Sequence, residues 1–425
     1  MMSGSDAHGR TSNTTQSIPA PFPRLHLSLG EGPRAFAAPS GLDRTRSARQ
    51  LKSAVPVGAA AALSAATIEV PETGDRCMPF ASPHFGVLYE HPEWFGPLFA
   101  ELDRRSIGYD RILATSLNFN PADGAASHAL VLNRMSPSAY LRGHGHAIFA
   151  SLAYLRHLEI MGVPVVNGAD AFSLELSKTA QISLLSRLGL PHPRTRVINT
   201  PAQAVAAARH LAFPLLVKPN IGGSGAKIQR FDALKDLEAA VAGGVLDLGI
   251  DHTTLVQEYH APVGGSIVRV EVLDGRFLYA IRVFPNPSAG FNLCPADICQ
   301  PDGTVAATPP VVSLPQPEKE PGASSSALDY CPVDLPRTNL RVEGYTPPQE
   351  IVAHVLRIAQ AARIDVGGIE YLISERDGRL YFYDINVLSN FVTDAPRVVG
   401  FDPVPVFVDY LEKRAATGAV VLRSS

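Results

Sequence analysis

The chain has few of the features that mark secreted or nucleic-acid-binding proteins. Its four cysteines, Cys77, Cys294, Cys299 and Cys331, form no CxxC pair, which argues against a disulfide scaffold and fits a reducing cytoplasm. Basic and acidic residues number 37 and 40, so a formal net charge of −3 excludes a general electrostatic attraction to nucleic acid. We therefore expect a cytoplasmic protein whose partners do not include nucleic acid.

Membrane-spanning, hydrolase and zinc-ribbon patterns are also lacking. The longest apolar run, Ala54–Val70, contains Pro56 and Gly58, and the basic residues before it give only a superficial likeness to a signal peptide. No GxSxG motif occurs, and Cys294 and Cys299 lack two further zinc ligands at suitable spacing. We expect no membrane association.

What the chain does have is the composition and length of a multidomain globular protein. It contains 425 residues, of which 46% are hydrophobic and 18% charged. Residues 1–75 lack periodicity and are predicted to be a disordered tail, unless the true start is nearer Met78. Strands and helices alternate in residues 76–175, which predicts a small α/β domain with a mostly parallel sheet. The two remaining segments are 176–262 and 263–425, the latter with a proline-rich, irregular insertion at 300–348.

Lysine is scarce, since arginine outnumbers it 30 to 7, and two of the lysines stand in unusual places. Lys178 lies in the first turn of a helix predicted at 177–188, where the helix dipole disfavours a cation. Lys218 ends the apolar strand Leu215–Lys218, so it needs an anion close by. A glycine loop of Gly222, Gly223, Ser224 and Gly225 follows, and its N–H groups suit phosphate oxygens. A solvated Lys178, a carboxylate partner for Lys218 and a plain linker turn are the alternatives.

Two predicted hairpins carry further charged residues. In the second, Glu370 faces Asp384 and Asn386 only if the turn at Asp377-Gly378 is bulged or of odd length, for example the three-residue Arg376–Gly378. Two carboxylates and an amide oxygen suit Mg²⁺, whereas a solvated strand face is the alternative. Tyr383 would then lie on the opposite, core face.

The first hairpin turns at Asp274-Gly275, which suits a two-residue type I′ turn. That turn would place Arg269 opposite Ala280 with Arg282 beside it, as a clamp for a carboxylate or acyl phosphate. Glu271 shares this face, so an ion pair with one arginine is the alternative. Asn292 is a polar neighbour.

The order of these parts resembles the ATP-grasp superfamily, with the RimK-like, α-L-glutamate-ligase-like group as the nearest likeness. The resemblance covers about residues 85–420 without the insertion, and its fold is α/β (α+β) with an N-terminal pre-ATP-grasp domain. The matching segments are LSKTAQISLLSRLGLPHPRT (176–195), LLVKPNIGGSGAKI (215–228), LVQEY (255–259), VRVEVLDGRFLYAIR (268–282) and GGIEYL…YFYDIN (367–386).

The resemblance implies a role for each matched residue. Lys178 and Lys218 contact nucleotide phosphates under the loop Gly222–Gly225, and the backbone of Gln257, Glu258 and Tyr259 reads adenine. Glu370, Asp384 and Asn386 hold one or two Mg²⁺, with Mn²⁺ as a substitute. Arg269, Arg282 and Asn292 steady the carboxylate and its acyl phosphate.

The activity implied is an ATP-dependent carboxylate–amine ligase that joins a small carboxylate to an amine, such as an amino acid or peptide, and releases ADP and phosphate. An ATP-grasp kinase and a non-catalytic nucleotide-binding module are the alternatives. Two departures from the family pattern, at Val387–Phe391 and Leu293–Asp297, fall where the acceptor would bind. The sequence therefore leaves both substrates open, together with assembly into a homo-oligomer.

Overall fold

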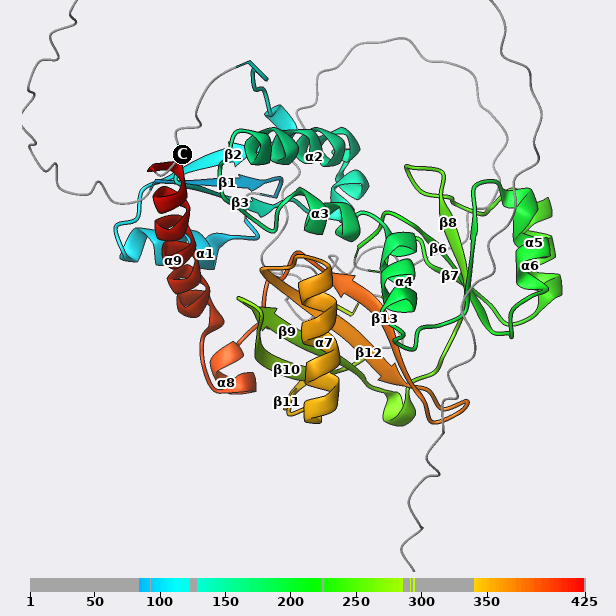
Figure 1. Cartoon of the computed structure of the whole chain (residues 1–425). Coiled ribbons are helices and arrows are strands. Elements are labelled where there is room, and N and C mark those ends of the chain that lie inside the picture. Colours follow the sequence, from blue (N-terminus) through cyan, green and yellow to red (C-terminus); the bar gives the residue numbers. More distant parts are fainter. Residues whose placement is uncertain are drawn as a thin grey trace, which may run out of the picture. The chain divides into compact units, whose positions relative to one another are not determined.

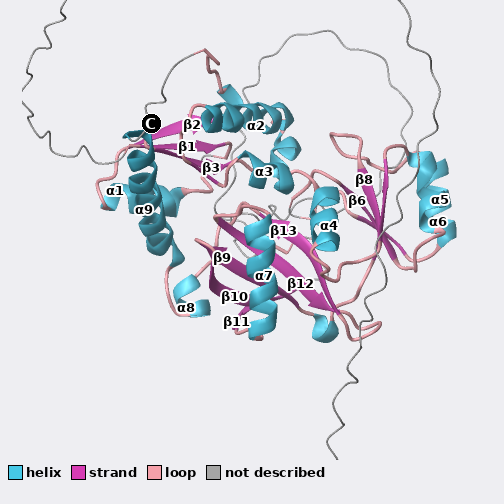
Figure 2. Ribbon diagram, viewed as in Figure 1, coloured by secondary structure: helices cyan, strands magenta, loops and turns pink. Residues whose placement is uncertain are grey.

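The structure is a computed structural model that describes residues 84–91, 93–122, 128–223, 225–285, 291, 293–294 and 340–423, without the side chains of 418–423. The predictions for residues 1–75 and Met78, for Ser224 and Asn292, and for most of the insertion lie outside this part. Within it, three sheets are joined by helices (Figures 1 and 2). None of the described helices is both long and apolar enough to span a membrane.

The first sheet is parallel, as predicted, with the strand order β2-β1-β3-β4. Its strands are β1 (Phe85–Tyr89), β2 (Tyr109–Leu113), β3 (Leu130–Arg134) and β4 (Val165–Val166). Alternate residues of β1 and β3 enter two cores. One contains α1 (Gly96–Arg104) and α9 (Pro403–Arg423), and the other contains α2 (Gly145–Ile160) and α3 (Ala169–Glu175). Because both of its faces are covered, the central strand β1 is buried at every position and carries no charged side chain.

The second sheet is antiparallel, with the order β5-β8-β6-β7. Its strands are β5 (Thr195–Ile198), β6 (Leu215–Pro219), β7 (Gln229–Phe231) and β8 (Thr254–Glu258), and they pack on α5 (Ala204–Ala208) and α6 (Leu234–Ala242). The predicted helix before this sheet is α4 (Lys178–Arg187), where the Ser177 hydroxyl accepts a hydrogen bond from Ala180 N at 3.1 Å.

The third sheet is also antiparallel, with the order β11-β10-β9-β12-β13. Its strands are β9 (Ile267–Leu273), β10 (Arg276–Phe284), β11 (Arg341–Tyr345), β12 (Val366–Ile373) and β13 (Leu380–Asn386), and α4 and α7 (Gln349–Ala361) pack on one face. Short elements complete the chain: α8 (Ala395–Val399) and the 3₁₀ helices Ala114–Ser116, Pro137–Arg142, Pro201–Gln203 and Val263–Gly265. Strand β11 corrects the prediction that 300–348 is irregular throughout, because Arg341–Tyr345 pairs with β10 as an edge strand.

The first hairpin has the predicted turn but not the predicted register. Asp274 and Gly275 both have positive φ, at 52° and 68°, and Leu273 pairs with Arg276. A bulge between Phe277 and Tyr279 then moves the register by one residue, so Arg269 lies opposite Ile281. The prediction that Arg282 shares a face with Arg269 is therefore wrong, because a one-residue offset turns a side chain to the other side of the sheet.

The second hairpin also contains a bulge, and here it produces the predicted pairing. Glu370 lies opposite Asp384, but the register shifts between Glu370 and Tyr371. Ser374 N donates to Arg379 O at 2.8 Å, so the turn itself is longer than the predicted three residues. The extra residue is Tyr383, within β13. The offset that aligns the carboxylates thus arises in the strand rather than in the turn.

Candidate active site

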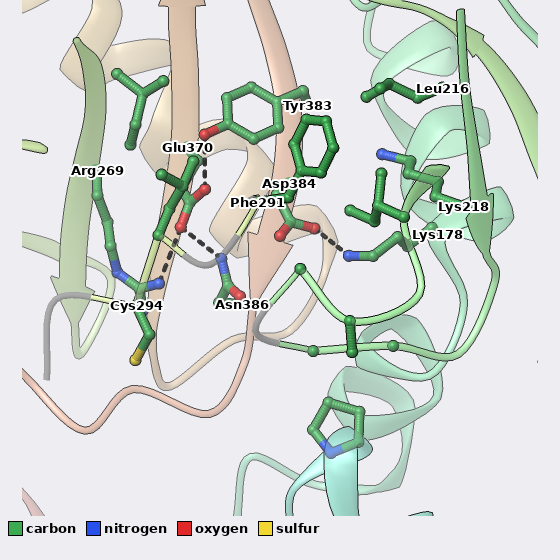
Figure 3. A pocket seen from close by; sticks show the side chains of 18 of the residues that line it. Lys178, Leu216, Lys218, Arg269, Phe291, Cys294, Glu370, Tyr383, Asp384 and Asn386 are labelled. Carbon is green, nitrogen blue, oxygen red and sulfur yellow. Dashed lines mark hydrogen bonds and ion pairs between the residues drawn. The ribbon is translucent and has the colours of Figure 1, made fainter. Parts of the chain in front are cut away.

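Residues from all three sheets line one cavity of about 260 Å³ (Figure 3). The N-terminal sheet supplies loop residues that follow β1 and β3, the second sheet supplies β6, β8 and the glycine loop, and the third supplies β9, β12 and β13. Its polar lining consists of Ser136, Ser138, Glu175, Lys178, Lys218, Gln257, Glu258, His260, Arg269, Glu370, Tyr383, Asp384, Asn386 and Asn390. Most of the site residues that were predicted on separate segments therefore line the same cavity.

The two lysines differ in their partners. Lys178 forms an ion pair with Asp384, which raises the pKa of Lys178 although burial opposes this. Lys218 is 5% exposed, and its Nζ makes no hydrogen bond or ion pair with any residue that the structure describes. Burial, together with the charge of Lys178, lowers the pKa of Lys218 to about 8. A buried ammonium group that forms no direct ion pair is unfavourable, so it indicates a binding position for an anion such as a phosphate.

The glycine loop borders the same cavity through Gly222, Gly223 and Gly225. A side chain on Gly223 would place its Cβ 3.3 Å from Cβ of Ser138, and Gly225 has a φ of +67°, which favours glycine. The loop therefore lies close to the N-terminal domain without side chains between its backbone and the cavity. Ser224 falls outside the described residues.

The segment Gln257–Tyr259 lies at the end of β8 and also lines the cavity. Gln257 is held by Thr195, to whose hydroxyl its Nε2 donates at 2.9 Å, and the Glu258 carboxylate accepts from Ala212 N at 2.8 Å. Glu258 N donates to Arg194 O and Tyr259 N donates to Pro214 O. Recognition of adenine by the backbone of this segment stays a prediction. The N–H groups of Glu258 and Tyr259 already donate hydrogen bonds within the protein, so they are not free to bind the base.

Glu370, Asp384 and Asn386 converge on one side of the cavity (Figure 3). Glu370 accepts hydrogen bonds from Asn386 Nδ2 at 3.2 Å and from Arg269 Nη1 at 3.1 Å. Burial and the nearby Asp384 raise the pKa of Glu370, whereas Lys178 and Lys218 lower that of Asp384 against the effect of burial. Two crowded carboxylates beside an amide oxygen form an all-oxygen donor set, which fits Mg²⁺.

Arg269 reaches the cavity and Arg282 does not. Arg269 is 5% exposed, and its Nε donates to Glu271 at 2.6 Å, so the alternative of an ion pair with Glu271 is confirmed. A side chain on Gly368 would come within 2.5 Å of Arg269 Nε, so this glycine makes room for the guanidinium. Arg282 is exposed and stacks on Tyr345 at 4.2 Å. Asn292 falls outside the described residues.

Several cavity residues were not expected from the sequence. Tyr383 was predicted to face the core, but the bulge turns it to the cavity, where its hydroxyl donates to Glu370 at 2.8 Å. Glu175, in α3, is buried and accepts from Val387 N, and burial raises its pKa to about 7. Trp94 and Ser136–Ser138 enter from the loops after β1 and β3. The sequence offered one indication of these residues: ligands often bind at the carboxyl ends of parallel strands, and these loops follow such ends.

Comparisons with known proteins find similarity to ligases, by sequence over about a third of the chain and by fold over most of it. The chain is 30% identical over 135 residues to the "Probable alpha-L-glutamate ligase" of Teredinibacter turnerae and 33% identical over 135 residues to the "D-alanine--D-alanine ligase" of Haemophilus influenzae. The matches span 32% and 30% of this chain, and only 44% and 43% of the length of those relatives. No family model matches the chain.

The solved structure of the ATP-grasp ligase PsnB, complexed with its minimal precursor, matches over 79% of this chain and 100% of PsnB. The TM-score is 0.51 and the sequence identity 18%, which establishes a common fold. The cavity lies among three sheets whose order along the chain agrees with the fold predicted from the sequence. The chain thus has the ATP-grasp fold and is similar in sequence, over part of its length, to proteins named as an α-L-glutamate ligase and a D-alanine–D-alanine ligase.

Proposed function

We propose that the protein is an ATP-dependent carboxylate–amine ligase. A substrate carboxylate would attack the γ-phosphorus of ATP, which releases ADP and gives an acyl phosphate. An amine would then attack the acyl carbon, lose a proton and displace phosphate, so that an amide forms. The observation that carries this proposal is the buried Lys218, which has no hydrogen-bond or ion-pair partner among the described residues and lies in the same cavity as the carboxylates Glu370 and Asp384.

Each part of the cavity has a role in that reaction. Lys218 and Lys178 would bind the phosphate oxygens of ATP, and the glycine loop would enclose them with backbone N–H groups. Asp384 forms an ion pair with Lys178, and ATP with a divalent cation would compete for both partners. Glu370, Asp384 and Asn386 would hold Mg²⁺, which supplies charge neutralisation on the transferring phosphoryl group.

Positioning accounts for the rest of the chemistry. Arg269 is fixed by Glu271 and Glu370, so its guanidinium is placed before any substrate arrives. Such preorganised charge stabilises a developing negative charge on the acyl phosphate without reorganisation. Tyr383 and Asn386 orient Glu370 by hydrogen bonds at 2.8 and 3.2 Å. No protein nucleophile is required, because the substrate carboxylate itself attacks ATP.

The substrates would be a small carboxylate and an amine, the latter an amino acid or a peptide. Trp94 and Pro137 line the cavity from the N-terminal domain, and Leu388 and Phe391 line it from the segment after β13. Leu388 and Phe391 belong to the segment Val387–Phe391, where the sequence departs from the family pattern. We infer that these residues choose the acceptor.

Incubation of the purified chain with Mg-ATP, pooled carboxylates and pooled amino acids tests the proposal. We expect ADP together with a new mass equal to carboxylate plus amine minus water. Lys218→Met should abolish both signals, whereas Lys235→Met, on the exposed side of α6, should leave both unchanged. Formation of AMP and pyrophosphate would contradict an acyl-phosphate route.

Two other outcomes would replace the proposal. ADP together with a stable phosphorylated product, formed without an amine, would identify a kinase. ATP that binds without turnover across the pools would support a nucleotide-binding module. Mass spectrometry of products and a parallel ATP-binding measurement distinguish the three cases in one series.

A further inference from the structure

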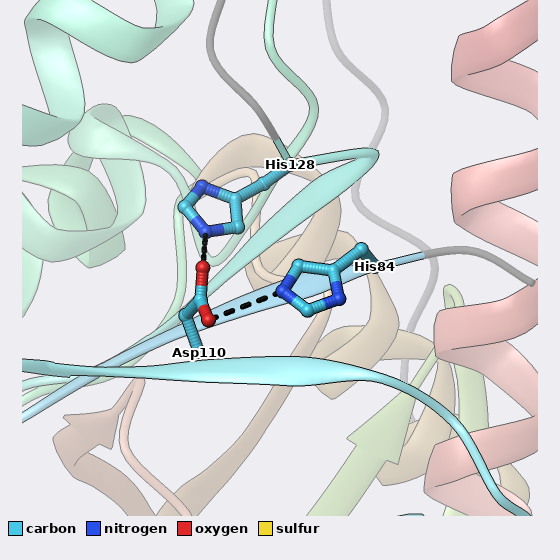
Figure 4. A group of neighbouring side chains, drawn as sticks. All are labelled: His84, Asp110 and His128. Carbon is cyan, nitrogen blue, oxygen red and sulfur yellow. Dashed lines mark hydrogen bonds and ion pairs between the residues drawn. The ribbon is translucent and has the colours of Figure 1, made fainter.

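A second group of ligating side chains lies on the N-terminal sheet (Figure 4), and none of its members lines the cavity. His84 precedes β1, Asp110 is in β2, and His128 precedes β3. His84 Nε2 lies 3.2 Å from one carboxylate oxygen of Asp110, and His128 Nε2 lies 2.9 Å from the other. One ligand atom from each residue lies within 4.8 Å of those of the other two.

The sheet is shaped to hold the two imidazole rings at this place. A side chain on Gly108 would put its Cβ 2.7 Å from Nδ1 of His84, and one on Gly86 would come 3.2 Å from Cγ of His128. The backbone is fixed as well, since Phe85 N donates to Gly108 O and Ala129 N donates to His84 O, each at 2.9 Å. The positions of the two imidazole rings are thus set by the backbone of the strands that they adjoin.

The donor types and spacings suit a zinc ion. Mg²⁺ and Ca²⁺ prefer oxygen ligands alone, whereas two imidazole nitrogens and one carboxylate oxygen are ordinary zinc ligands. Bonds of about 2.0–2.2 Å in a tetrahedron separate ligand atoms by roughly 3.3–3.6 Å. Here one ligand atom from each residue lies within 4.8 Å of those of the other two, so a small rotation of the side chains would bring them to that spacing. The Asp110 side chain is 57% exposed and that of His84 45%, which leaves room for a water ligand.

We propose that His84, Asp110 and His128 form a Zn²⁺ site that links the amino-terminal ends of three neighbouring strands. The site is separate from the proposed ligase chemistry. In a parallel sheet the cavity residue Trp94 follows the carboxyl end of β1, whereas His84 precedes its amino end. Loss of ligase activity would therefore not bear on the zinc site, nor would absence of zinc bear on the ligase.

Calorimetric titration of the EDTA-treated full chain with ZnCl₂, in excess Mg²⁺, tests the proposal. We expect one zinc ion per chain, and a loss of affinity of about 100-fold or more in Asp110→Asn and in His84→Gln. Free zinc at 100 times its dissociation constant should shift the unfolding equilibrium about 100-fold towards the folded state. That shift should be absent in both variants.

Matched controls distinguish this site from others in the chain. Asp103→Asn and His146→Gln change exposed residues of the same types on α1 and α2 and should bind zinc normally. X-ray absorption spectra of the bound zinc should show nitrogen and oxygen ligands alone, at about 2.0–2.2 Å. The proposal is overturned by unaltered binding in Asp110→Asn and His84→Gln, by a sulfur ligand at about 2.3 Å, or by no stoichiometric zinc, which would leave only a hydrogen-bonded triad.

Discussion

Replacement of Lys218 by methionine should affect stability and nucleotide binding in opposite directions. Burial lowers the pKa of Lys218 from 10.5 to about 8. At 1.36 kcal/mol for each pKa unit, the charged form costs the unliganded protein roughly 3 kcal/mol. The cost is complete below pH 8 and disappears as the pH rises towards 10.5, because the unfolded chain binds the proton more tightly. Lys218→Met should therefore raise the free energy of unfolding at pH 7 by up to about 3 kcal/mol.

ATP binding should weaken in the same variant. The ammonium of Lys218 makes no hydrogen bond or ion pair with any described residue, so a phosphate would be the first anion in direct contact with it. A hydrogen bond to a charged group contributes about 1.5–3 kcal/mol, which corresponds to a dissociation constant for ATP raised roughly 10- to 150-fold. Methionine keeps a side chain of similar length, so the loss of charge is the principal change.

Urea unfolding of the nucleotide-free protein between pH 7 and pH 10 measures the first effect, and calorimetric titration with Mg-ATP measures the second. The difference in unfolding free energy between the variant and the parent should shrink as the pH rises through 8. Lys235→Met, on the exposed side of α6, should stay within about 0.5 kcal/mol of the parent and bind ATP normally. A less stable Lys218→Met with unchanged ATP affinity would refute the reasoning.

Three further substitutions probe the rest of the site. Asp384→Asn removes a proposed Mg²⁺ ligand and the partner of Lys178, so ADP formation should fall by about 100-fold or more at saturating ATP; a fall of less than 5-fold would argue against a metal role. Tyr383→Phe removes one hydrogen bond to Glu370 and should lower kcat by about 10-fold, and an increase in KM alone would place Tyr383 in substrate binding instead. Arg282→Ala should change neither activity nor stability by more than about 0.5 kcal/mol, because Arg282 is exposed and turned from the cavity, and a large loss of ADP formation would restore it to the site.

The local elements of the fold were largely predictable from the sequence. Short apolar runs indicated β1 and β6, because strands buried on both faces are largely apolar. The Asp274-Gly275 turn between two strand patterns indicated β9 and β10. Ser177 and the residues after Leu188 indicated both ends of α4, since a hydroxyl cap and glycine satisfy helix termini. Strand β11 was not predicted, because it is a short edge strand inside a proline-rich segment and pairs with a partner more than fifty residues earlier in the chain.

The residues of the candidate site also fall into two groups, those that the sequence could indicate and those that it could not. Lys218, Glu370, Asp384 and Asn386 could be named because each is a polar residue on a largely apolar strand, where a ligand or a partner would justify it. Lys178 could be named because the dipole disfavours a cation in the first turn of a helix. Arg282 and Tyr383 could not be placed correctly. Their orientation depends on bulges in β10 and β13, and a bulge reverses every side chain beyond it without a signature in the local sequence.

The sequence by itself determined the order of the elements, the two unusually placed lysines, the glycine loop and the likeness to ATP-grasp proteins, because these follow from local patterns of charge and apolar residues. Only the tertiary structure decided which side chains meet. It separated Arg269 from Arg282, turned Tyr383 towards Glu370, and brought His84, Asp110 and His128 together from three strands. The physical reason is that strand pairing sets these contacts, and pairing between strands far apart in the chain depends on how the whole sheet packs rather than on any one segment.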